Sequence, residues 1–110
     1  MEITTKDIET IKIIELVGEI DTKTAPIITE KVLAFVQPES KLLIDMSQVE
    51  YMSSAGLRML LSLYRTATAK DAKLALAGLS EDLQDTMSIT GFLDFFTTYD
   101  TVETGIKTLK

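Results

Sequence analysis

Apolar and polar positions along the chain predict strands that alternate with helices. Residues Ile8–Val17 roughly alternate between apolar and polar before Gly18, so we expect a strand there, paired with Glu2–Thr5. Two shorter segments, Lys41–Met46 and Lys73–Ala77, are nearly continuous apolar runs. Such runs are typical of strands covered on both faces of a sheet, so the first of them should lie centrally.

The first expected helix follows a group of small polar side chains. Asp21–Thr24 with Pro26 is an arrangement that commonly begins a helix, and Pro38 is expected to end it. Its apolar face would consist of Ile28, Val32, Phe35 and Val36.

A second helix should begin near Ser53 or Ser54, after a short loop over Ser47–Met52. Residues at helical spacing would form its buried side: Leu57, Leu60, Leu61, Tyr64 and Ala67.

The last third of the chain predicts two more helices and one strand. Ser80 and the two acidic residues after it are typical of a helix start, and this helix should stop near Gly91. Phe95–Tyr99 is expected to be the last strand. Asp100 with Glu103 three positions later predicts a capping box for a final helix. The apolar residues of these two helices are Leu83 and Met87, and then Val102, Ile106 and Leu109.

This element order predicts an α/β fold with about five strands and about four helices, forming one domain over residues 1–110. The sheet should be mixed, with a leading hairpin and a largely parallel core. In such sheets functional groups lie where strands end and the following helices begin. Ser53 and Ser54 occupy a junction of this kind.

Charge and hydropathy narrow the expected partners and location. The formal net charge is −6 and no segment gathers Lys or Arg, so we expect no binding to nucleic acid. The longest apolar runs are far shorter than a bilayer span, and an acidic surface is repelled by anionic lipid, so we expect no membrane partner. The first residues lack the pattern of a signal peptide. We therefore expect a cytoplasmic protein.

Two missing residue types narrow the expected chemistry. The chain has no Cys and no His, which removes thiolate nucleophiles, Cys-based zinc sites, Ser-His-Asp triads and imidazole ligation. Composition leaves a carboxylate site for a hard cation open, but the acidic residues show no calcium-loop spacing. We expect no cofactor and no enzymatic activity.

Three short segments carry a family resemblance. Leu43–Leu57 contains an apolar strand with an Asp near its end, a short connection and then Ser-Ser-Ala-Gly-Leu. Gly18–Asp21 reads Gly-Glu-Ile-Asp, and Met87–Phe92 reads Met-Ser-Ile-Thr-Gly-Phe. With these landmarks in this order, the whole chain resembles the anti-sigma factor antagonists of the STAS family.

The resemblance implies a phosphorylation site. Ser54 falls on the family's phosphorylated serine, Gly56 on its glycine, and Asp21 on the acidic residue beside that serine. The chain departs from many members at Ser53, where they have Asp, and at Ala55, where they have Ser or Thr. The surface around the site that would contact partners comprises Asp21, Thr22, Thr24, Met52, Ser53, Ala55, Gly56 and Arg58.

Each of these residues also has a purely structural interpretation. Ser54 could simply cap its helix, a common role for Ser worth about 1 kcal/mol. Ser53 is expected to be a loop or capping hydroxyl rather than the phosphate acceptor. Asp21 could be only a turn residue.

The resemblance also implies a partner-switching cycle. The unphosphorylated domain would bind an anti-sigma factor that is also a serine protein kinase, which uses its own ATP and magnesium ion to phosphorylate Ser54. Phosphorylation would end binding, and a metal-dependent serine phosphatase would restore it.

Three alternatives stay open. The chain could be the small STAS subunit of a lipid-trafficking ABC transporter, binding the ATPase subunit without a phosphate cycle. A STAS tail of an anion transporter is a further alternative. An enzyme acting through Ser54 would need Lys or a carboxylate as base, and no Lys stands near the motif in sequence.

Overall fold

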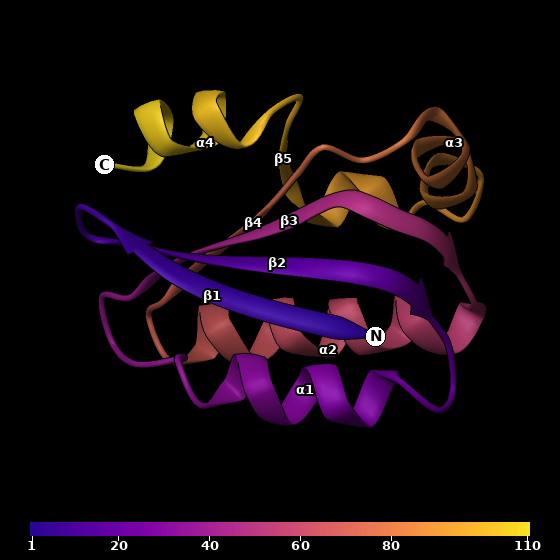
Figure 1. Ribbon diagram of the computed structural model, residues 1–110, viewed down its shortest axis with the longest axis horizontal. Helices are drawn as coiled ribbons and strands as arrows, with labels where there is room; N and C mark the ends of the chain where they lie inside the picture. Colours follow the sequence, from indigo (N-terminus) through magenta and orange to yellow (C-terminus); the bar gives the residue numbers. More distant parts are fainter.

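The computed structural model describes all 110 residues as one five-stranded sheet with helices on both faces (Figure 1). The strands are β1 (Glu2–Ile8), β2 (Ile11–Ile20), β3 (Lys41–Met52), β4 (Lys73–Ala77) and β5 (Thr97–Tyr99). The helices are α1 (Ala25–Leu33), α2 (Ser54–Ala69), α3 (Glu81–Ile89), the 3₁₀ helix η1 (Phe92–Phe95) and α4 (Val102–Leu109).

The sheet order is β1-β2-β3-β4-β5. β1 is antiparallel to β2, and all other neighbouring strands are parallel. The predicted α/β fold, with a mixed and largely parallel sheet, a leading hairpin, four α-helices and a central third strand, is confirmed.

The two faces of the sheet carry separate hydrophobic cores. Leu42 and Ile44 of β3 belong to the larger core, shared with α1, α2 and α3, whereas Leu43 belongs to a smaller core under α4. Figure 1 shows α1 and α2 below the sheet and α4 above it. Since side chains of a strand alternate between faces, a strand covered on both faces is largely apolar, and Asp45 is the one buried polar residue of β3. Leu42–Met46 is buried along its whole length, as its apolar run predicts.

The amino-terminal hairpin differs from the single long strand expected over Ile8–Val17. β1 extends to Ile8, and the chain turns at Glu9, which has a φ of 57°. β2 then runs through Gly18 instead of ending there. Gly18 has a φ of 125°, which glycine tolerates, and the pairing with β3 shifts register next to it. The glycine therefore bends the strand without ending it.

The loop expected over Ser47–Met52 is wrong, because these residues continue β3. The extension pairs with the extended end of β2, and its last pair joins Met52 to Ile20. Val49 and Met52 are buried in this segment. A polar sequence forms a strand here because the neighbouring strand supplies backbone partners.

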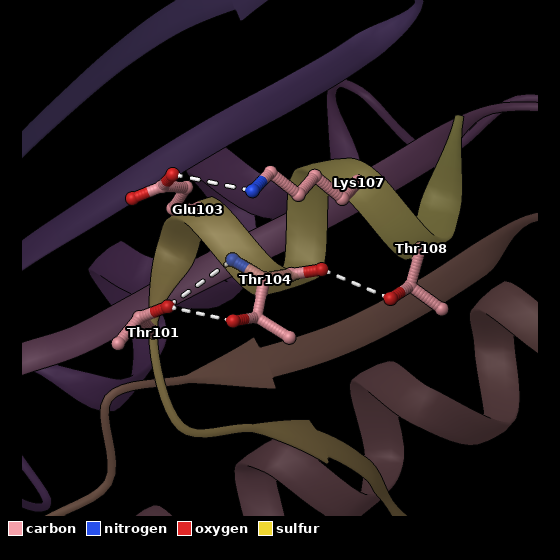
Figure 2. A network of polar contacts seen from close by, with 5 residues as sticks. All are labelled: Thr101, Glu103, Thr104, Lys107 and Thr108. Atoms are coloured by element: carbon pink, nitrogen blue, oxygen red, sulfur yellow. Dashed lines mark hydrogen bonds and ion pairs between the residues drawn. The ribbon is translucent and has the colours of Figure 1, made fainter.

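Two helix ends also differ from expectation. α1 ends at Leu33, so Phe35 and Val36 follow the helix, and Pro38 is not its last residue. The final helix is capped by Thr101, whose hydroxyl accepts a hydrogen bond from the Thr104 N–H at 3.1 Å (Figure 2), so the predicted cap at Asp100 is wrong.

The expected last strand over Phe95–Tyr99 is too long, because Phe95 ends the helix η1 and β5 begins at Thr97. The start of α3 is as predicted, since Ser80 caps it and Leu83 and Met87 are buried.

Candidate functional site

The candidate site lies where β2 and β3 end and the chain enters α1 and α2, at the right of Figure 1. The backbone N–H of Ser53 donates a hydrogen bond of 2.8 Å to the carbonyl of Ile20. Ser54 and Asp21 each follow one residue after this bond. Two of the three segments of the resemblance, Gly18–Asp21 and Leu43–Leu57, are thus joined by a backbone hydrogen bond between residues 33 apart in sequence.

Gly56 sets how closely α2 approaches the strand ends. A Cβ atom at this position would lie 2.7 Å from Cγ2 of Ile20 and 2.8 Å from Cγ of Met52. Real Cβ atoms do not approach carbon so closely, and Ile20 is fully buried. A glycine is needed here because the first turn of the helix rests directly on the ends of β2 and β3.

The two serines have different environments. Ser53 is the N-cap of α2, and its hydroxyl accepts a hydrogen bond of 3.2 Å from the N–H of Gly56. Ser54 is the first residue of the helix and is exposed, and its hydroxyl has no hydrogen-bond partner in the chain. The prediction that Ser53 is a capping residue is confirmed, and the interpretation of Ser54 as the cap is wrong.

Asp21 is held in a tight turn that leads into α1. Its Oδ1 accepts hydrogen bonds from the backbone N–H of Thr24 at 3.0 Å and of Lys23 at 2.9 Å. The hydrogen bond from Thr24, with a further contribution from that of Lys23, lowers the pKa of the Asp21 carboxyl below 3.8. Asp21 therefore serves as the turn residue that one interpretation expected, with a charge that persists at neutral pH.

The other predicted residues divide between a supporting and an exposed set. Met52 is buried, and the hydroxyl of Thr24 donates to the carbonyl of Glu19 at 2.9 Å, so both support the turn and the helix start. Thr22 and Arg58 are exposed, and Ala55 is half-buried. The side chains of Thr22 and Arg58 are thus accessible to a partner.

Two exposed apolar residues near the ends of β2 and β3 are not among those that the sequence predicts for the site. Tyr51, three residues before Ser54, is 53% exposed, and Ile27 in the first turn of α1 is 57% exposed. Because Ser47–Met52 is expected to be a loop, the sequence assigns its side chains to no face of the sheet, and the exposure of Tyr51 is not predicted. Exposed aromatic side chains are common at protein interfaces.

A groove of about 450 Å³ runs along the exposed side of α2. It is lined by Arg58, Leu61, Ser62, Arg65, Thr66 and Phe92. The structure contains no group of three or more Asp and Glu side chains that could hold a metal ion, and no helix is long and apolar enough to cross a membrane.

Comparison with known proteins places this arrangement in a family. The model of the STAS domain matches residues 2–105. The anti-sigma-B factor antagonist of Listeria monocytogenes is 35% identical over 95 residues, which cover 86% of this chain and 82% of the relative.

Two solved structures share the fold. An anti-sigma factor antagonist from Mycobacterium paratuberculosis superposes with a TM-score of 0.85 at 24% identity, covering 98% of this chain and 92% of that one. The Bacillus cell fate determinant SpoIIAA in its phosphorylated form superposes with a TM-score of 0.73 at 16% identity, covering 99% and 100%. The chain therefore belongs to the STAS domain family, and its similar relatives include anti-sigma factor antagonists.

Proposed function

We propose that this protein is an anti-sigma factor antagonist whose binding is switched off by phosphorylation of Ser54. The observation that carries the proposal is the division of labour between the two serines, because Ser53 caps α2 and leaves the exposed Ser54 hydroxyl free. The similarity in sequence to an anti-sigma-B factor antagonist, and in fold to the cell fate determinant SpoIIAA solved in its phosphorylated form, supports it.

The partner in this proposal is an anti-sigma factor that is also a serine protein kinase. The Ser54 oxygen attacks the γ-phosphorus of ATP bound to the kinase, an Oγ–P bond forms, and the bond to the β-phosphate oxygen breaks. ADP leaves, and the hydroxyl proton passes to a base of the kinase. A metal-dependent serine phosphatase reverses the state by transferring the phosphoryl group to water.

Phosphate at Ser54 would change charge with little strain. Phosphorylation adds about 1.5 to 2 negative charges, and the start of a helix accommodates an anion well. Asp21, next to the backbone bond that joins the two segments, already carries a negative charge. A partner surface that fits the unmodified site would then bury a mismatched charge, and we expect its affinity to fall by about 2–4 kcal/mol.

The test is phosphorylation and capture with matched serine variants. Wild-type, Ser53→Ala and Ser54→Ala proteins are used to isolate partners from the native host, and the captured kinase is then incubated with each variant and ATP. We expect wild-type and Ser53→Ala to gain one phosphate and release the kinase. Ser54→Ala should bind and stay bound. Normal phosphorylation of Ser54→Ala, or capture of a transporter ATPase in place of a kinase, would refute the proposal.

A further inference from the structure

The exposed side of α2 carries both arginines of the chain in line with Ser54. Ser54, Arg58, Ser62 and Arg65 are exposed, while the residues between them are largely buried. Residues four apart in a helix lie on the same side, so Arg58 is one turn beyond Ser54. Arg65 follows two further turns along the same side.

Arg58 has no ion-pair partner in the protein. The three ion pairs of the chain all use lysines: Lys12 with Asp7, Lys107 with Glu103, and Lys110 with Glu9. The first turn of α2 contains no acidic residue. Asp21, which precedes α1, uses its carboxylate to accept hydrogen bonds from two backbone N–H groups. The Arg58 guanidinium is therefore free to bind an anion.

From this spacing we propose that Arg58 binds the phosphate of phosphorylated Ser54 and so serves as the positioning residue of the switch. The proposal rests on the function proposed above and adds the residue that receives the phosphate. Helical side chains lean toward the amino terminus, which directs the Arg58 guanidinium toward Ser54. A negative group four residues before a positive one is also the favourable orientation. The planar guanidinium donates two N–H groups to phosphate oxygens.

This contact gives the switch a second effect besides added negative charge. In the unmodified protein Arg58 borders the groove beside α2 and is available to a carboxylate of a partner. Once it binds the phosphate, that cation is neutralised. Phosphorylation would then add repulsion and remove an attractive group from the same surface.

The contact can be tested without the kinase. Phosphoserine is incorporated at position 54 during translation, and the second pKa of its phosphate, about 6 in an unperturbed site, is measured by phosphorus NMR. Attraction between Arg58 and the second phosphate charge at about 4 Å, the separation of a direct contact, lowers that pKa by about 0.8 in water.

Three variants separate this contact from general charge effects. Arg58→Gln should raise the phosphate pKa by about 0.8, and Arg58→Lys, which keeps the charge, should restore most of the decrease. Arg65→Gln removes the same charge about 16 Å further along the helix from Ser54, and should leave the phosphate pKa nearly unchanged.

Identical phosphate pKa values for the wild-type, Arg58→Gln and Arg65→Gln proteins would overturn the inference, as would equal shifts in the two glutamine variants. Because the phosphate is installed directly, either result is independent of which residue the kinase modifies. Failure of this contact would therefore leave the kinase experiment on Ser54 to decide the proposed function by itself.

Discussion

Replacement of Ser53 and of Ser54 by alanine should have opposite consequences for stability and for switching. In Ser53→Ala the N–H of Gly56 loses its acceptor, and Gly56 is buried in the first turn of α2. Loss of an N-cap hydroxyl typically costs about 0.5–2 kcal/mol. The bond is 3.2 Å long, at the weak end for an N–H donor, so we expect a loss of about 1 kcal/mol.

Ser54→Ala removes a hydroxyl that has no hydrogen-bond partner, at an exposed helical position. Alanine is the better helix former by about 0.5 kcal/mol. The unfolding free energy should therefore be unchanged or slightly higher. For a chain near 100 residues, a loss of 1 kcal/mol lowers Tm by about 4–8 °C, so only Ser53→Ala should show a clear decrease.

Urea and thermal unfolding of both variants and the wild type measure this difference, and phosphorylation by the captured kinase is scored in parallel. We expect Ser53→Ala to be less stable and still phosphorylated, and Ser54→Ala to be as stable as wild type and unphosphorylated. If Ser54→Ala instead loses about 1 kcal/mol while Ser53→Ala is unaffected, the cap belongs to Ser54 and the reasoning fails.

Three further predictions concern the surroundings of the site and the last helix. Gly56→Ala should lower the unfolding free energy, measured in urea, by about 1–2 kcal/mol. The reason is that the clash of the new Cβ atom with Ile20 and Met52 exceeds the gain of about 1 kcal/mol in helix propensity. Ser62→Ala, on the exposed side of the same helix, is the control and should not destabilise the protein. Because the pKa of Asp21 is lowered in the folded state, its ionised carboxylate stabilises the fold above pH 3.8. The stability advantage of wild type over Asp21→Asn should therefore be full at neutral pH and vanish as the pH falls through the folded-state pKa. An advantage that persists in acid would show that it does not come from the charge of Asp21. Thr101→Ala should increase amide hydrogen exchange in α4 whereas Asp100→Ala should not, because the hydroxyl of Thr101 caps this helix (Figure 2). Equal exchange in the two variants would refute the assignment of the cap to Thr101.

Most of the fold could be predicted because the positions that the fold buries are the apolar positions of the sequence. The apolar runs at Lys41–Met46 and Lys73–Ala77 both form strands covered on two faces, and the apolar residues of α2 at helical spacing are largely buried. The failures occur where backbone pairing outweighs side-chain pattern. Ser47–Met52 looks like a loop because most of its side chains are polar, yet it is a strand because β2 extends beside it.

The site was only partly predictable for a related reason. The position of Ser54 at the start of a helix could be inferred from the motif, but the assignment of the cap depends on a difference of one residue in backbone conformation. Ser53 has a φ of −78° and a ψ of 171°, which is extended and suits an N-cap. Whether Arg58 forms an ion pair depends on the distances from its guanidinium to the carboxylates of the folded protein, and these distances cannot be read from the sequence.

The extension of β3 also determines how a phosphate at Ser54 can act. Because β3 continues to Met52 and α2 starts at Ser54, Ser53 is the single residue between them. Its N–H is bonded to Ile20, its hydroxyl accepts from Gly56, and Gly56 packs closely against Ile20 and Met52. The start of α2 is thus held against β2 and β3, and no flexible loop separates β3 from α2. An added phosphate meets a rigid surface, so it changes the charge presented to a partner much more readily than the position of the helix.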